Sequence, residues 1–113
     1  MQRGEIYFVQ LNPVVGREQA NVRPVLVVSV DEINQMPLVV TVVAGTDSAR
    51  VVQDFRSNVR IPASASGLPA ETVFLCFQIR ARDHSRFPAQ VAGRLSPTWM
   101  KEIQKALRYC LGM

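Results

Sequence analysis

The sequence contains few of the residues that most often bind metals or act as nucleophiles. Its 113 residues include one histidine, His84, and two cysteines, Cys76 and Cys110. A mechanism that needs two histidines is therefore excluded within one chain. There is no CxxC, no HExxH and no acidic metal-binding loop, so we expect that any catalysis needs no protein-bound metal and no cofactor. The cysteines fall in an apolar segment and near the end of a predicted helix, which is typical of small buried side chains in a reducing compartment.

Long hydrophobic runs are absent as well. No apolar run approaches the roughly 20 residues that a membrane-spanning helix needs, and the N-terminus enters a predicted strand at once, unlike a signal peptide. We therefore expect a cytoplasmic protein without a membrane partner. A hydrophobic content of 48% with 19% charged residues is typical of a globular chain. The length fits a single domain over residues 1–113.

Lysine is scarce, whereas arginine is abundant. Only Lys101 and Lys105 are lysines, eleven residues are arginines, and the net charge is +4. Arginine holds phosphate with two parallel N–H bonds, which a lysine cannot do. This balance fits a nucleic-acid partner, but it fits many ordinary soluble proteins too. A GC-rich genome would also favour arginine, so composition leaves the partner open.

Hydrophobic periodicity predicts several strands and little helix before residue 96. Residues 5–11, 25–30, 38–43 and 73–79 are the strongest strand candidates, and 56–61 and 90–95 are weaker ones. Residues 31–34 read as one helical turn or a loop. Residues 44–55 read as a loop, 62–69 as a turn, and 80–88 as a charged stretch.

The last segment has the pattern of an amphipathic helix. Ser96 is a suitable N-cap, Pro97 suits the first helical position, and Gly112 suits the C-terminal cap. Apolar residues between Trp99 and Cys110 recur at helical spacing. Because no crossover helices separate the strands, the sheet should be mainly antiparallel. A small, strongly curled β-barrel with one C-terminal helix against it satisfies this pattern.

The clearest candidate site lies between residues 3 and 29, which read as strand, long loop, strand. Arg23-Pro24 closes the loop where it enters the apolar strand VLVVS. A guanidinium fixed at such a junction can bind a phosphate. The alternative is a structural arginine that holds its loop by pairing with Glu18.

The segment RGEIYFVQLNPVVGREQANVRPVLVVS closely resembles the opening of the MazF/PemK family of toxin–antitoxin toxins. The shared pattern is R-G-E/D-I/V, L-x-P, G-x-E-Q and R-P-V-L-V. The resemblance continues in a strand that ends at Thr46, in FQIRARDHSR and in the final helix, so it covers almost the whole chain. It implies an SH3-like β-barrel with a C-terminal helix, acting as a homodimer. It also implies a sequence-specific, metal-independent endoribonuclease that cleaves single-stranded RNA, mainly mRNA, halts translation and is neutralised by a cognate antitoxin.

The resemblance assigns catalysis to three residues. Its loop-end arginine falls on Arg23, its threonine on Thr46 and its loop glutamate on Glu18. Because a guanidinium stays protonated, we expect Arg23 to stabilise the transition state. Thr46 either binds the phosphate or orients the 2′-OH, and otherwise serves as a capping hydroxyl in a loop. Glu18 either accepts the 2′-OH proton or orients Arg23.

The expected RNA-binding residues are Arg17, Gln19, Gln78, Arg80 and Arg86. Three positions depart from the family pattern. Phe77 replaces a common acidic residue, and Arg17 stands where some members have histidine. Gly45 lies beside Thr46, where it could loosen the site or reshape base recognition. Phe8 and Trp99 are expected in the core because periodicity places them inward.

Two other functions fit parts of the sequence. A gyrase poison of the same fold would use a C-terminal Trp-Gly motif, but this chain ends Leu111-Gly112-Met113 with Trp99 inside the helix. A non-catalytic module that binds single-stranded nucleic acid would show strong salt dependence and produce no new RNA ends.

Overall fold

The computed structural model describes residues 1–10, 22–36 and 38–113. Its strands are β1 Glu5–Gln10, β2 Val22–Val27, β3 Val39–Asp47, β4 Asn58–Ile61, β5 Thr72–Asp83 and β6 Gly93–Arg94. Its helices are α1 Asp31–Asn34, η1 Ser48–Arg50, α2 Ala63–Ser66, η2 His84–Arg86 and α3 Pro97–Leu111, where η marks a 3-10 helix. Each predicted strand therefore exists, although several have different ends.

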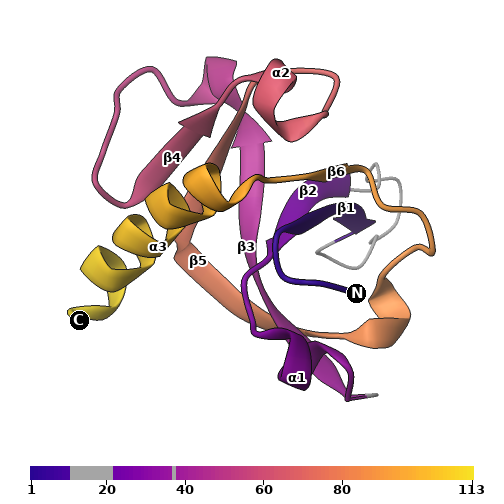
Figure 1. Cartoon of the computed structure of the whole chain (residues 1–113). Coiled ribbons are helices and arrows are strands. Elements are labelled where there is room, and N and C mark those ends of the chain that lie inside the picture. Colours follow the sequence, from indigo (N-terminus) through magenta and orange to yellow (C-terminus); the bar gives the residue numbers. More distant parts are fainter. Residues whose placement is uncertain (11–21, 37) are drawn as a thin grey trace, which may run out of the picture.

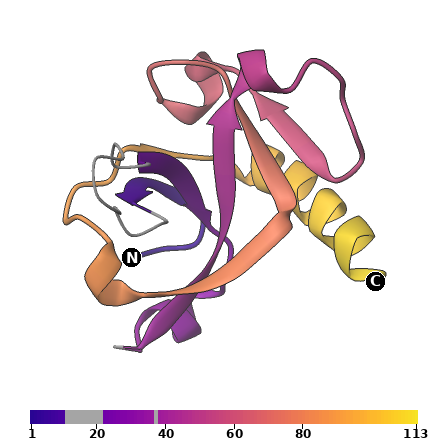
Figure 2. The same ribbon diagram turned by 180° about the vertical axis from the view of Figure 1, so that it is seen from behind.

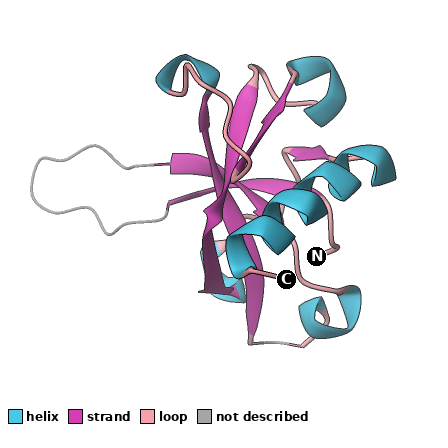
Figure 3. Ribbon diagram, turned by 90° about the vertical axis from the view of Figure 1, so that its left-hand side faces the viewer, coloured by secondary structure: helices cyan, strands magenta, loops and turns pink. Residues whose placement is uncertain are grey.

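The strands form one sheet with the order β4-β5-β3-β2-β1-β6, and every pairing between the described strands is antiparallel. The sheet curls into a half-barrel, and α3 lies across one side of it (Figures 1 and 3). This arrangement confirms the predicted class, a curled antiparallel sheet with a C-terminal helix.

Two strands are longer than the sequence pattern indicates. Residues 44–47 were expected in a loop, and residues 80–83 in a charged stretch after the end of a strand, but they extend β3 and β5. The reason is that β3 and β5 pair with each other along these residues. Thr46 is opposite Val73, and Val39 is opposite Asp83. Ladder hydrogen bonds with a neighbouring strand hold polar residues in extended conformation, and local composition does not reveal them.

The β3–β5 pairing is interrupted by a bulge. Val43 is opposite Ile79, but the next residue, Ala44, is opposite Leu75. Residues 76–78 are therefore extra on β5, and the strand bends sharply in its middle part (Figure 2). Phe77, at the centre of this insertion, is 55% exposed.

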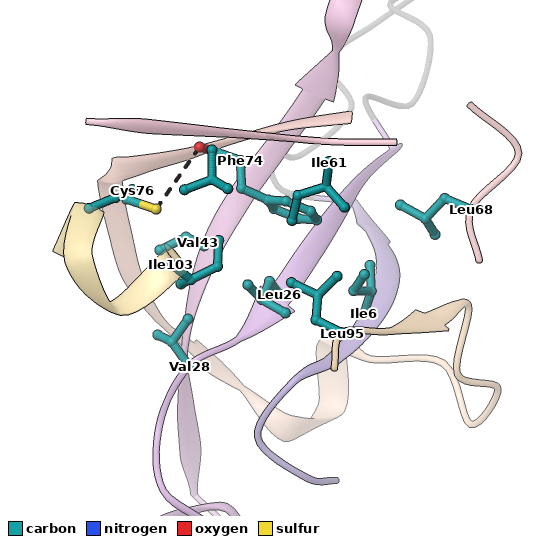
Figure 4. Close-up of a cluster of buried hydrophobic side chains, with 12 residues drawn as sticks. Ile6, Leu26, Val28, Val43, Ile61, Leu68, Phe74, Cys76, Leu95 and Ile103 are labelled. Atoms are coloured by element: carbon teal, nitrogen blue, oxygen red, sulfur yellow. Dashed lines mark hydrogen bonds between the residues drawn. The ribbon is translucent and has the colours of Figure 1, made fainter. Parts of the chain in front are cut away.

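The sheet is packed on both faces. The larger cluster lies between the sheet and α3 and includes Ile6, Leu26, Phe74 and Ile103, all of which are fully buried (Figure 4). The second cluster covers the other face and includes Val9, Val25, Val27, Val42 and Ala44, with Tyr7 packed edge-to-face on Phe87. Burial on both sides explains why the strands read as nearly continuous apolar runs.

Helix α3 matches its prediction closely. The Ser96 hydroxyl accepts the Trp99 N–H at 3.4 Å, Pro97 is the first helical residue, and Gly112 ends the helix in the left-handed conformation at φ 70°. Ile103 and Ala106 carry its buried side. The prediction that Phe8 belongs to the core was wrong, because this ring is 39% exposed. Tyr7 and Val9, on either side of Phe8 in β1, are buried in the second cluster. The sequence pattern alone does not show that the position of Phe8 is exposed to solvent.

A buried carboxylate ties the first strand to the last. Glu5 is only 5% exposed, and its side chain accepts hydrogen bonds from the Tyr7 hydroxyl at 3.2 Å and from Arg94 Nη2 at 2.9 Å. Burial, together with the Glu5 carboxylate, raises the pKa of Tyr7 to about 12. The neutral phenol is therefore the form that the fold stabilises.

This network predicts a loss of stability in alkali. A phenol has an ordinary pKa of about 10, so the contribution of Tyr7 is complete below that pH and is lost as the pH rises to about 12. Urea unfolding at pH 8 and pH 12 should give a fall in the free energy of unfolding that is about 2 kcal/mol larger for the wild type than for Tyr7→Phe. Equal falls in the two proteins would contradict the proposed role of the buried phenol.

Candidate functional site

A cleft of about 410 Å³ opens where β2 begins and β3 ends. Phe8 from β1, Arg23 from β2 and Thr46 from β3 line it, and Arg50 of η1 lies at its margin. Residues 68–72, which lead into β5, contribute further to its lining. The cleft therefore brings together residues that are far apart in the sequence, and most of them lie on strands.

The register of β2 and β3 places Arg23 beside Thr46. Val25 is opposite Ala44, so Arg23, two residues before Val25, and Thr46, two residues after Ala44, lie beside each other on the same side of the sheet. Arg23 Nη1 donates a hydrogen bond to Thr46 Oγ1 at 3.1 Å. The structure thus brings together two of the three predicted catalytic residues.

This pair is suited to binding an anion. Thr46 is 6% exposed, and Arg23 is half-buried. The Thr46 oxygen accepts the bond from Arg23, which leaves its own O–H to donate elsewhere. A guanidinium has five N–H donors and no acceptor, so Arg23 keeps others available. Together the two side chains offer convergent donors and one positive charge.

Two carboxylates also line the cleft, and each already has a partner. Asp47 accepts the Ala49 N–H at 2.9 Å and so caps η1. Glu71 lies 3.5 Å from Arg60 Nη1. The predicted proton acceptor, Glu18, lies outside the described residues, as do Arg17 and Gln19.

The remaining predicted RNA-binding residues lie away from the cleft. Arg80 is opposite Val42, four residues before Thr46 on β3, which corresponds to about 13 Å along the strand. Gln78 belongs to the bulge and Arg86 to η2. Burial lowers the pKa of Arg82, and the neighbouring charges of Arg80 and Arg86 lower it further. These three arginines therefore form a concentrated positive group at the other end of β3.

Sequence reasoning missed two residues of the cleft. Phe8 was expected in the core, and Arg50 lies in a stretch that reads as an ordinary polar loop. Nothing in the local pattern distinguishes Arg50 from the other arginines, because its place depends on how η1 is held against β4 and β5.

A larger hollow of about 880 Å³ lies beside α3 and β4, and it contains none of the predicted site residues. Among the described residues, no group of three or more histidine, cysteine, aspartate or glutamate side chains could hold a metal ion. Within the same part of the chain, no helix has the length and apolar character needed to cross a bilayer.

Comparison with known proteins identifies a family. Residues 2–111 match the model of the PemK-like, MazF-like toxin of type II toxin–antitoxin systems. The chain is 34% identical over 113 residues to the endoribonuclease EndoA of Bacillus subtilis, covering 100% of this chain and 96% of the relative.

Solved structures share the fold. A MazE–MazF complex from Deinococcus radiodurans superposes with a TM-score of 0.80 at 23% identity, covering 100% of this chain and 96% of the other. A mycobacterial endoribonuclease in complex with its cognate antitoxin gives a TM-score of 0.79 at 22% identity, with the same coverage.

Gly45, beside Thr46, is tightly packed, in contrast to the expectation that it loosens the site. A Cβ at this position would lie 2.8 Å from Thr72 Cγ2, 3.0 Å from Phe74 Cε1 and 3.1 Å from Pro24 Cγ. Real Cβ atoms essentially never come as close as the first of these distances, and the other two are unusually short. Both the Thr72 and Phe74 side chains are buried. The absence of a side chain here lets β2, β3 and β5 pack against one another in the wall of the cleft.

Gly45→Ala should therefore destabilise the protein by about 1–3 kcal/mol, the usual cost of overpacking a filled interior. Urea unfolding monitored by circular dichroism measures the change. Adding Thr72→Ser removes the nearest methyl group and should recover part of the loss, while Thr72→Ser alone provides the matched reference. If Gly45→Ala is as stable as the wild type, the backbone in the wall of the cleft is not closely packed.

Proposed function

Because the chain belongs to the PemK-like, MazF-like toxin family of type II toxin–antitoxin systems, we propose that it is a metal-independent endoribonuclease that cleaves single-stranded RNA and halts translation in the cytoplasm. The observation that carries this proposal is the hydrogen-bonded pair of Arg23 and Thr46 in the cleft. The EndoA relative, which is named an endoribonuclease, supports cleavage over gyrase poisoning.

The chemistry follows from the donors that the pair offers. The 2′-OH of one nucleotide attacks the adjacent phosphorus, the bond to the 5′ oxygen of the next nucleotide breaks, and that oxygen takes up a proton. Negative charge grows on the non-bridging oxygens during this step. Arg23 N–H groups and the Thr46 O–H stabilise that charge because they are already held in place before the substrate binds. The products are a 2′,3′-cyclic phosphate and a 5′-OH.

A separate group must accept the 2′-OH proton, since a guanidinium stays protonated in proteins. In our proposal Glu18 has this role, or it orients Arg23 instead. Arg17 and Gln19 of the same segment contact the RNA bases or backbone. Phe8 lies exposed in the cleft, so its ring is available to stack on a base, as aromatic side chains do in many single-strand binders.

The arginines at the other end of β3, Arg80, Arg82 and Arg86, would extend the RNA-binding surface. Arg80 and Arg82 are opposite Val42 and Val40, whose side chains belong to the face of the sheet that also carries Val9, the partner of Arg23. Paired residues of antiparallel strands share a face. In our proposal the RNA backbone passes along the rim of this face, whose central side chains are buried, with Gln78 and Arg86 as further contacts.

We also propose that the chain forms a homodimer through the region around Ser57. The Ser57 carbonyl accepts the Cys76 N–H at 2.9 Å and lies 4.0 Å from Cys110 Sγ. The sequence neighbours Phe77, Tyr109 and Leu111 are each more than half exposed. Large apolar side chains exposed at one place are typical of an interface between proteins. By analogy with the solved toxin–antitoxin complexes, a cognate antitoxin would bind this chain and block its cleft.

Arg23→Ala should abolish RNA cleavage, with a loss of at least about 10³-fold, and Thr46→Val should cost about 10²-fold, as for other single donors to a transition-state oxyanion. The assay is cleavage of a long single-stranded transcript by purified protein in EDTA, with circular dichroism to verify folding. Lys101→Ala removes one positive charge from α3, outside the cleft, and should cleave at the wild-type rate.

Full activity of Arg23→Ala would contradict the proposed mechanism. If the wild type cleaves only after a divalent metal is added, metal independence is wrong. Mass spectrometry of the products separates the reaction classes, because 5′-phosphate ends would rule out attack by the 2′-OH. A wild-type protein that binds RNA but yields no new ends would be a binding module.

Leu111→Asp should convert the dimer to a monomer, because the change places a charge in the proposed interface. Light scattering after size-exclusion chromatography measures the mass directly. Met36→Asp is the matched control, since Met36 is 54% exposed and follows α1, which lies away from α3 and β4 (Figure 1). A dimer that persists in Leu111→Asp would show that the subunits meet elsewhere.

A further inference from the structure

The short helix η1 places a second cation at the cleft. It follows Thr46-Asp47 directly, and its last residue, Arg50, lines the same cleft as Arg23 and Thr46. The Arg50 side chain is exposed and has no hydrogen bond or ion pair with any other described residue. Its charge is therefore available to a ligand.

Arg60 of β4 holds this helix at both ends. Its Nη1 donates to the carbonyl of Ser48 at 3.4 Å, and its Nη2 donates to the carbonyl of Val51. These carbonyls belong to the first residue of η1 and to the residue just after Arg50. The Ser48 N–H in turn donates to the Glu71 carbonyl at 3.3 Å, which ties the helix to the segment before β5.

The same guanidinium balances the nearby carboxylates. Arg60 Nε pairs with Asp54 at 3.0 Å and Nη1 with Glu71 at 3.5 Å. Glu71 lines the cleft, so Arg60 offsets a negative charge that would repel a polyanion. The planar fork of arginine is needed here because one ammonium group cannot reach two carbonyls and two carboxylates at once.

We propose that Arg50 contacts an RNA phosphate beside the one that is cleaved, and that Arg60 is a positioning residue that holds Arg50 there. This proposal rests on the proposed function, because it assumes that RNA occupies the cleft. The ligand class is a phosphodiester backbone, which an arginine binds with charge-assisted hydrogen bonds.

Binding tests the first part without any need for cleavage. The probe is a fluorescent single-stranded 2′-fluoro RNA of mixed sequence, which lacks the attacking hydroxyl. At low salt, Arg50→Ala should weaken binding about tenfold, the worth of one hydrogen bond to a charged group. In a salt titration it should lower the slope of log K against log salt by about 0.7, the value for one phosphate contact to a single strand. Lys101→Ala should leave both the affinity and the slope at wild-type values.

A double-mutant cycle tests the positioning role. Arg60→Lys keeps the positive charge near Asp54 and Glu71, but it cannot donate hydrogen bonds to carbonyls at both ends of η1. It should weaken binding about threefold to tenfold when Arg50 is present, and it should have no further effect in the Arg50→Ala background. In the cleavage assay, both single variants should raise KM and leave kcat within about twofold, since neither residue touches the reacting atoms.

The outcomes separate this proposal from the proposed function. An unchanged affinity and salt slope in Arg50→Ala would overturn the phosphate contact, even if the wild type cleaves RNA normally. An Arg60→Lys effect of equal size in both backgrounds would overturn the positioning role. If the wild type binds the probe with the predicted Arg50 dependence but never cleaves a transcript, the proposed catalysis fails and the Arg50 contact stands.

Discussion

The geometry of the cleft depends on the pairing between β2 and β3. Arg23 meets Thr46 only because Val25 is opposite Ala44 and Leu26 is opposite Val43. A slip of one residue would move Arg23 to the other face of the sheet. The register is fixed by burial, since Val25 and Leu26 are fully buried in different clusters on the two faces. The packing of the core therefore sets the position of the candidate catalytic donors.

The backbone behind the donors is equally constrained. On the side of the sheet opposite to Arg23, the ring of Pro24 packs near Gly45 and Phe74, with no space for another methyl group. A donor pair on two such strands loses little conformational freedom when an anion binds, which is what preorganised stabilisation of a transition state requires. The family pattern R-P at the start of β2 thus has two physical functions: the arginine supplies hydrogen-bond donors, and the proline ring packs beside Gly45 in the wall of the cleft.

The sequence was most informative where burial and capping decide the structure. The apolar strands and the helix that begins after Ser96 were predicted correctly in kind and order. It was least informative where pairing with a strand distant in the sequence determines the structure. The extension of β3 through Thr46, for example, depends on pairing with Val73. Arg50 could not be found for the same reason, since its position depends on bonds from Arg60 to backbone carbonyls. The family resemblance supplied Thr46 as a site residue, whereas composition alone indicated only a loop hydroxyl.

The distribution of charge also argues for a polyanionic ligand. A net charge of +4 is modest, but Arg80, Arg82 and Arg86 lie close enough to lower the pKa of Arg82, and its Nε has no hydrogen-bond partner among the described residues. Like charges gathered in this way destabilise the folded chain by mutual repulsion. Asp83, whose pKa is lowered by hydrogen bonds from Ser85 and further by the charges of His84 and Arg86, offsets part of this repulsion. Phosphates would supply both the opposite charge and the missing acceptor. Because Arg23 and Arg50 lie at the other end of β3, one extended strand of RNA along the rim of this face, whose central side chains are buried, would contact both positive groups.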